Sequence, residues 1–279
     1  MTPTARPIDE LVCEAQAGSK PALQEVVVGI QDQVYGLALR MLWHSEDARD
    51  ATQEILVRVV TGFANFRGDS KFATWVYRVA SNYLISFRQS RAELNAYTFQ
   101  SFGEELTKNL ADEPAYCKGD PEREVLLQEL RIGCTTGMLL CLDRPHRLAY
   151  ILGEILEIEG KEAAEILEIP AANYRQRLVR ARRAIVAFMK ARCGLVNPAN
   201  ACRCHRRLAF ALGKRRVDPE NPLFTRDPVQ ARRFPEIISL VRSLQEAQRA
   251  AEVYRAQAKP IAPRSLAAEI RRVIEGLGV

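Results

Sequence analysis

The sequence predicts an all-α protein of two or more domains, and three observations support this prediction. Apolar residues recur at intervals of three and four along most of the chain, whereas the alternating pattern of strands is nearly absent. The periodicity fades in two stretches: 93–121, which carries Gly and Pro, and 217–235, which carries four prolines. The length of 279 residues favours two or more modest domains over one. We therefore expect two helical domains, a flexible linker and a helical carboxy-terminal extension.

The first domain, residues 1–92, is expected to contain an amphipathic helix over 26–42 and two more. Ser45 can cap the second, in which Glu46 and Asp47 put negative charge at the helix N-terminus and which runs to about residue 61. The third helix is expected from about residue 72 to about residue 91. The acidic, Gly- and Pro-containing stretch 93–121 is expected to be the linker.

The second domain, 122–192, is expected to be helical, and the extension is expected to occupy 193–279. The extension begins with a cysteine-containing loop. After its proline-rich connector, two helices are expected, over 236–258 and 265–276. The first of these helices carries an apolar face made of Ile237, Leu240, Val241 and Leu244.

The formal net charge of +6 hides a strong polarisation along the chain. Residues 171–216 contain 13 Lys or Arg and no Asp or Glu, so the remainder carries a net charge of −7. A cationic tract of this density predicts contact with DNA or RNA. Because no apolar run approaches the roughly 20 residues that span a bilayer and the start lacks a signal-peptide layout, we expect a cytoplasmic protein without a membrane contact.

Aromatic and basic side chains alternate between residues 63 and 91, which suits single-stranded DNA because unpaired bases stack on aromatic planes while cations hold phosphates. Trp75, Arg78 and Asn82 share one face of the third helix and are the predicted contacts. The other face is predicted to be buried and carries Val76, Val79, Tyr83 and Phe87.

The preceding helix carries an acidic stripe, in which Asp47, Asp50 and Glu54 recur at intervals of three and four around Gln53. Such a row would repel DNA, so we expect it to dock a basic protein partner.

A helix-turn-helix is expected in the second domain. A short helix over 161–167 is followed by a turn at 168–170 and by an arginine-rich helix from about Ala172. The N-terminal residues of that helix can enter a major groove, while its later arginines meet phosphates.

These segments resemble a known family. Residues Asp47 to Glu54 and Phe66 to Asn82 are similar to region 2 of the extracytoplasmic-function sigma factors of bacterial RNA polymerase, and Leu142 to Arg183 resembles region 4. The resemblance implies a promoter-specific initiation factor with no chemistry of its own and no required cofactor. It would recruit core polymerase, melt the minus-ten element and read the minus-thirty-five element.

The resemblance also implies partners and residue roles. The partners are the β′ clamp helices and the β flap of core polymerase, promoter DNA and, in many members of the family, an anti-sigma protein. The implied docking residues are Asp47, Asp50, Gln53 and Glu54. The implied minus-ten contacts are Phe66, Lys71, Phe72, Thr74, Trp75, Arg78 and Asn82, and the implied minus-thirty-five contacts are Asn173, Tyr174, Arg175, Arg177, Arg180 and Arg183.

Four positions depart from the family pattern: Asp143 replaces Pro, Glu168 replaces the Gly of the turn, and Asn173 and Gln176 replace Thr and Ser. The recognised promoter sequence is therefore open. The change at Glu168 also suggests that this turn residue has no need of a positive φ.

Seven cysteines in a cytoplasmic chain do not suggest a disulfide scaffold, but Cys193, Cys202, Cys204 and His205 form one cluster. Zinc is its natural ligand. The surrounding arginines would lower the thiol pKa values, so redox sensing is an alternative, and a purely structural role is another.

Two other functions compete with the sigma-factor interpretation. A stand-alone helix-turn-helix regulator would have no need of the acidic stripe. A zinc or redox enzyme would need a nucleophile and base pair, a carboxylate dyad or a phosphate-binding Gly loop, none of which is evident, and His44 and His146 are isolated. For the extension, the hypothesis is that it restrains or tunes the sigma domains.

Overall fold

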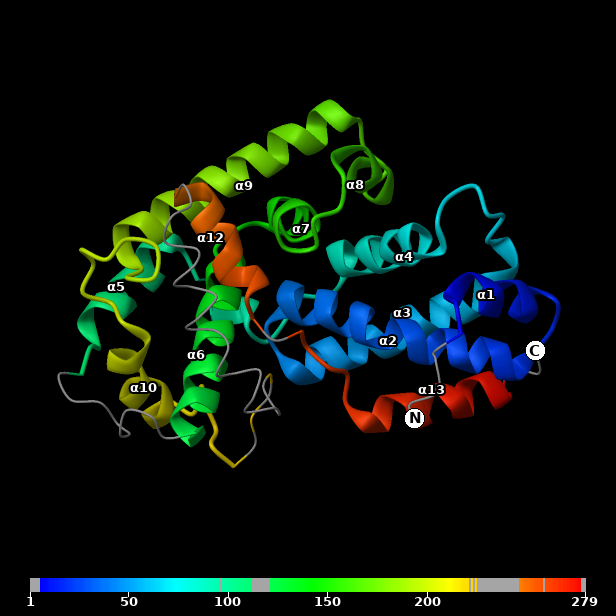
Figure 1. The fold of residues 1–279 in the computed structure, drawn as a ribbon, viewed down its shortest axis with the longest axis horizontal. Coiled ribbons are helices and arrows are strands. Elements are labelled where there is room, and N and C mark those ends of the chain that lie inside the picture. Colours follow the sequence, from blue (N-terminus) through cyan, green and yellow to red (C-terminus); the bar gives the residue numbers. More distant parts are fainter. Residues whose placement is uncertain are drawn as a thin grey trace.

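The computed structural model describes residues 6–95, 97–111, 121–220, 222, 224, 246–257 and 259–276. Throughout these residues the regular structure is helical apart from one isolated β-bridge, between Cys193 and Cys202, so the all-α prediction is confirmed. Two lobes lie side by side in Figure 1, with α1 to α4 in one and α5, α6 and α10 in the other. Helix α9 runs along the top of the second of these lobes.

The first lobe is built on two long antiparallel helices, α2 and α3. Ser19 caps α2 by accepting a hydrogen bond from the N–H of Ala22, so α2 begins earlier than expected. The cap of α3 is His44 rather than Ser45, because the His44 ring accepts from the N–H of Asp47. Helix α4 ends at Ser86, short of the expected residue 91. The elements of this lobe are α1 (Ile8–Gln16), α2 (Lys20–Leu42), α3 (Ser45–Thr61), η1 (Phe63–Asn65) and α4 (Phe72–Ser86).

The expected linker is not wholly extended. It contains η2 (Glu93–Asn95) and α5 (Phe99–Lys108), and a capping box between Thr98 and Ser101 begins α5. Phe102 and Leu106 bury one face of α5, which packs against α6 and α9. Amphipathic spacing and a good cap outweigh the local polarity that favoured a linker.

The second lobe carries the expected helix-turn-helix. Asp143 caps α7 by accepting from the N–H of His146, and a short π-helical segment, η3, extends α7. Helices α8 and α9 follow. The elements are α6 (Pro121–Leu140), α7 (Arg144–Tyr150), η3 (Ile151–Ile155), α8 (Gly160–Ile166) and α9 (Ala171–Arg192).

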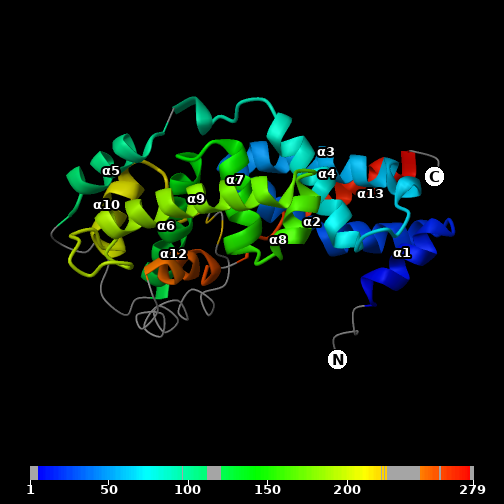
Figure 2. The same cartoon turned by 90° about the horizontal axis from the view of Figure 1, so that it is seen from above.

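The extension contacts both lobes. Its helix α10 (Cys204–Gly213) packs on α6, and α12 (Glu246–Arg255) packs on α9 and η3. Helix α13 (Arg264–Gly276), which confirms the expected terminal helix, returns to lie along α2 and α3, as Figures 1 and 2 show. The expected apolar face at Ile237, Leu240, Val241 and Leu244 lies outside the described residues.

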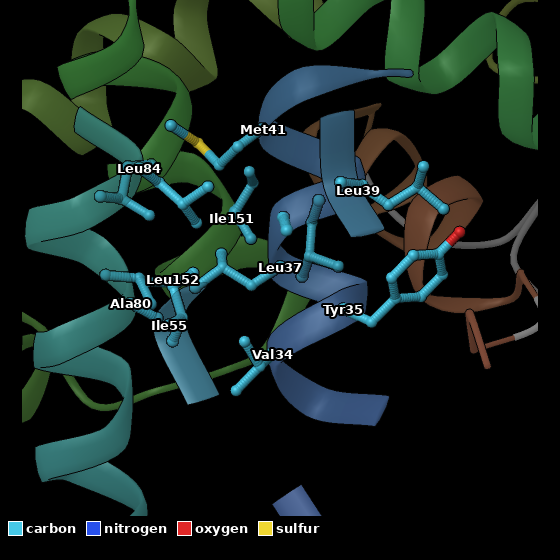
Figure 3. Close-up of a cluster of buried hydrophobic side chains, with 14 of the residues drawn as sticks. Val34, Tyr35, Leu37, Leu39, Met41, Ile55, Ala80, Leu84, Ile151 and Leu152 are labelled. Carbon is cyan, nitrogen blue, oxygen red and sulfur yellow. The ribbon is translucent and has the colours of Figure 1, made fainter. Parts of the chain in front are cut away.

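One hydrophobic core joins the two lobes. Figure 3 shows Ile151 and Leu152 of η3 among side chains of the first lobe, including Ile55 of α3 and Leu84 of α4. All four residues are fully buried. Because burying an Ile or Leu side chain is worth about 1.5–3 kcal/mol, this contact stabilises the closed arrangement of the lobes. Among the described residues, no helix is both long enough and apolar enough to cross a bilayer.

Candidate nucleic-acid interface

Three of the four residues in the acidic row on α3 face outward. The side chains of Asp50 and Glu54 are 48% and 45% exposed, and Gln53 between them is partly exposed. Each carboxylate contacts an arginine of its own helix: Asp50 lies 3.7 Å from Arg49, and Glu54 lies 2.9 Å from Arg58. These surface pairs are weak, so a stronger cationic partner can displace them.

Asp47, also expected in this row, lies elsewhere. It is fully buried, and one of its oxygens accepts a hydrogen bond of 2.8 Å from the backbone N–H of Arg91. Its other oxygen lies 3.3 Å from the Arg88 guanidinium. The carboxylate thus ties the start of α3 to the turn that follows α4. The prediction that it belongs to the exposed docking row is wrong, because burial leaves no surface for a partner.

The aromatic residues before and within α4 form a cluster. Phe72 is 3% exposed, and its ring centroid lies 5.4 Å from that of Phe66 and 5.8 Å from that of Trp75. Phe66 and Trp75 are only partly buried, and Lys71 beside them is exposed. Phe72 therefore supports the other two rings from the core and cannot itself stack on a base. Phe66 and Trp75 offer aromatic edges at the surface.

The polar face of α4 is covered by α8. The Thr74 hydroxyl donates to Glu162 over 2.5 Å, Arg78 donates to Glu165 over 2.9 Å, and Asn82 donates to Glu168 over 2.9 Å. Thr74 is 2% exposed as a result. We call these three contacts the α4–α8 ladder. Three of the predicted minus-ten residues thus come together, but they bind carboxylates of the second lobe.

The arginine-rich helix α9 presents an open basic face. Asn173, Arg175, Arg180 and Arg183 are exposed and Arg177 is partly exposed. Within the described part of the chain, none of these arginines forms an ion pair with a carboxylate. In contrast, Arg182 donates a hydrogen bond to Glu154 of η3.

Tyr174 was also expected to contact DNA, and this prediction is wrong. The residue is 2% exposed, and its hydroxyl donates to the Ala149 carbonyl over 3.3 Å. Burial raises the pKa of Tyr174 to about 12. It anchors α9 on α7 and so positions the exposed residues on either side of it.

The turn between α8 and α9 corrects another expectation. Glu168 has a φ of +52°, the left-handed conformation that glycine adopts most readily. The N–H of Ile169 donates to the Ala164 carbonyl and that of Glu168 donates to the Glu165 carbonyl, which together form a Schellman motif. The turn therefore has a positive φ although Glu stands there and not Gly, so the expectation that this residue has no need of a positive φ is wrong.

Three residues that the sequence did not single out clamp the lobes together. Glu93 lies 2.6 Å from Arg144 and 2.9 Å from Arg147. Arg147 is 2% exposed and also donates to the carbonyls of Met41, Leu139 and Leu142. Burial alone raises the pKa of Glu93, but hydrogen bonds from Arg144, from the Ser90 N–H and from Arg147 lower it to about 2. A lone acid in a polar stretch gives no sequence signal for such a clamp.

The cysteine cluster differs from the expected set. Cys193, Cys202 and Cys204 line a cavity of about 350 Å³ together with Cys134 of α6, whereas His205 is exposed and is not among the lining residues. Within the described residues, no three His, Cys, Asp or Glu side chains are placed to hold a metal ion. The sequence missed Cys134 because it lies about 60 residues before the others, on a different helix.

Burial, and not the nearby arginines, determines the direction of the thiol pKa shifts. Burial raises the pKa of Cys193 to about 12 and that of Cys202 to about 11, although Arg203, Arg206 and Arg207 oppose the shift at Cys202. The arginines do lower the pKa of Cys202, as expected, but burial and the neighbouring Cys204 outweigh them, so the net shift is upward. Because the thiolate is the reactive form, the raised pKa values make these two thiols less reactive near neutral pH.

Comparison with known proteins agrees with this geometry. Residues 27–93, which contain α3 and α4, match the family Sigma-70 region 2. The chain is 32% identical over 186 residues to the ECF RNA polymerase sigma-E factors of Escherichia coli K12 and of Salmonella typhimurium LT2, covering 63% of this chain and 90% of each relative. It is 29% identical over 183 residues to the RNA polymerase sigma-H factor of Pseudomonas aeruginosa, with the same coverage. The chain therefore belongs to the extracytoplasmic-function sigma factors and serves in transcription initiation.

Proposed function

We propose that this sigma factor binds core RNA polymerase through Asp50, Gln53 and Glu54, holds the melted minus-ten strand on α4 and reads the minus-thirty-five element with α9. The observation that carries the first part is the exposed acidic row, whose opposite helix face is fully buried in the first lobe. Its charge and position suit the basic surface that the family resemblance assigns to the β′ clamp helices.

The two DNA contacts differ in chemistry. Around α4, Phe66 and Trp75 offer stacking surfaces, and Arg78 and Asn82 offer donors for phosphates and base edges. On α9, Asn173 and Arg175 lie in the first turns, where a recognition helix meets base edges, and Arg180 and Arg183 follow for phosphates. The β flap is the expected polymerase contact of this second lobe.

Reconstitution with bacterial core RNA polymerase tests the proposal. Stable association on gel filtration is expected because the acidic row binds core polymerase, and run-off transcription from genomic fragments is expected because the two DNA surfaces bind the promoter. A chain that binds promoter fragments alone but never joins core polymerase would instead be a stand-alone regulator.

We also propose that the extension restrains the two sigma domains, a role that an anti-sigma protein would otherwise fill. Helices α12 and α13 lie on different lobes, and Asp32 of α2 holds the intervening chain by accepting from the N–H of Ala262 over 2.9 Å. Asp32→Ala should loosen α13 and raise transcription by the reconstituted enzyme. Unchanged transcription would remove this part of the proposal.

Zinc in the extension also belongs to the proposal, with Cys134 in place of His205. Four thiols around one cavity are the ligand type that structural zinc takes, but they must draw together to bind it. Elemental analysis should find zinc in the purified chain, lose it in Cys202→Ser and retain it in Cys13→Ser, whose thiol is exposed on α1. A wild-type protein free of zinc, purified without chelators, would contradict it.

A further inference from the structure

The acidic edge of α8 has a partner within the same chain. This edge consists of Glu162 and Glu165 of α8 and of Glu168 in the turn that follows α8. Its residues recur every three positions, and Thr74, Arg78 and Asn82 recur every four on α4. The two rows meet residue for residue in the α4–α8 ladder. Three successive side-chain contacts between the same two rows make this a defined interface.

We infer that the acidic edge of α8 competes with promoter DNA for the minus-ten face of α4. This inference rests on the proposed function, in which Arg78 and Asn82 contact melted DNA. In the ladder one guanidinium nitrogen of Arg78 and the amide nitrogen of Asn82 already donate to carboxylates, which offer the same kind of anionic oxygen as a phosphate. Thr74 is buried beneath Glu162, so DNA cannot reach it without removing α8.

The two promoter contacts cannot both form in this arrangement. By their names, the minus-ten and minus-thirty-five elements lie about 25 base pairs apart, which is roughly 85 Å at about 3.4 Å per base pair. Here α8, next to the recognition helix, contacts α4 directly, as Figure 1 also shows. Promoter binding therefore requires the ladder to break.

The ladder is built to be reversible. The Arg78 and Glu165 side chains are 28% and 51% exposed, and Asn82 and Glu168 are exposed, so water competes for these contacts. The acidic edge of α8 thereby sets the fraction of molecules in which the minus-ten face of α4 is free to bind DNA, and the closed state stays in equilibrium with the open one.

The test uses the full chain and the triple variant Glu162→Gln, Glu165→Gln, Glu168→Gln. Its matched control is Glu10→Gln, Glu159→Gln, Glu275→Gln, which removes the same charge from exposed glutamates outside the ladder. Dyes attached through non-natural amino acids at Ala64 of η1 and Ala187 of α9, both exposed, report the separation of the first lobe from α9 by energy transfer. Anisotropy of a labelled random-sequence single-stranded DNA of about 20 nucleotides reports binding.

The triple variant is expected to populate longer dye separations and to bind the DNA about 5-fold more tightly than the control, an effect that Arg78→Ala abolishes. Equal separations in the two variants, or an opened variant that gains no affinity, would overturn the inference. The proposed function fails separately: normal run-off transcription by Arg78→Ala would show that α4 does not hold DNA through this residue. Because the energy-transfer arm contains no DNA, it reports the ladder whichever outcome transcription gives.

Discussion

The acidic row of α3 and the polar face of α4 lie on neighbouring helices of one lobe, yet only the row is open to another molecule. Asp50 and Glu54 contact only arginines of their own helix, whereas Arg78 is bound by Glu165 from a different lobe. The difference implies an order of events. Under the proposed function, core polymerase docks on the closed chain, and promoter DNA binds only after the lobes separate.

Charge reversal in the acidic row is expected to give the largest effect. Asp50→Lys with Glu54→Lys should weaken core binding roughly 100-fold, because like charges would then face the basic partner surface. Binding of labelled core polymerase measures it, and Glu10→Lys with Glu275→Lys is the control of equal charge change. Equal loss in both variants would mean that general charge, not this row, governs docking.

Removing an arginine of α9 is expected to act on DNA alone. Arg175→Ala should reduce promoter affinity about 10-fold, since a recognition-helix contact is worth about 1–3 kcal/mol. Its guanidinium is exposed and makes no ion pair within the described residues, so folding should be unaffected. Promoter binding and core association are measured in parallel with Lys259→Ala as the control. Loss of core association would contradict the division of roles.

The contacts of Glu93 with Arg144 and Arg147 predict that the stability of the fold depends on pH. The folded pKa of Glu93 is about 2, below its ordinary value of 4.5, so its stabilisation is complete above about pH 4.5 and is lost as the pH falls toward 2. Glu93→Gln should lower the free energy of unfolding at pH 7 by about 2 kcal/mol, allowing for partial solvent screening.

Urea unfolding measured between pH 7 and pH 2 checks this prediction. The difference between wild type and Glu93→Gln should shrink across the acid window and not above it. Glu104→Gln, on the exposed face of α5, is the control. A constant difference at every pH would show that the carboxylate charge is not what joins the lobes.

The contrast between the two surfaces also explains what the sequence could predict. Helix periodicity located α3, α4 and the helix-turn-helix, because each places apolar residues on one face whatever its neighbours are. The burial of Asp47 and Tyr174 escaped prediction because each depends on a contact from another element: the Arg91 N–H and the Ala149 carbonyl. The α4–α8 ladder likewise joins residues more than 80 positions apart, and periodicity says nothing about such pairs.

The smallest effect is expected at Glu168, in the turn between α8 and α9. This residue has a strained backbone and also belongs to the α4–α8 ladder. A non-glycine residue at a φ of +52° costs about 1 kcal/mol, and glycine would relieve that cost. Glu168→Gly also removes the contact to Asn82, so the two effects oppose each other in the wild-type background. In the Asn82→Ala background the contact is already absent, and Glu168→Gly should then raise the free energy of unfolding by about 1 kcal/mol. Thermal unfolding of the four proteins separates the terms: a gain equal in both backgrounds would mean that the outermost contact of the ladder contributes nothing to closure.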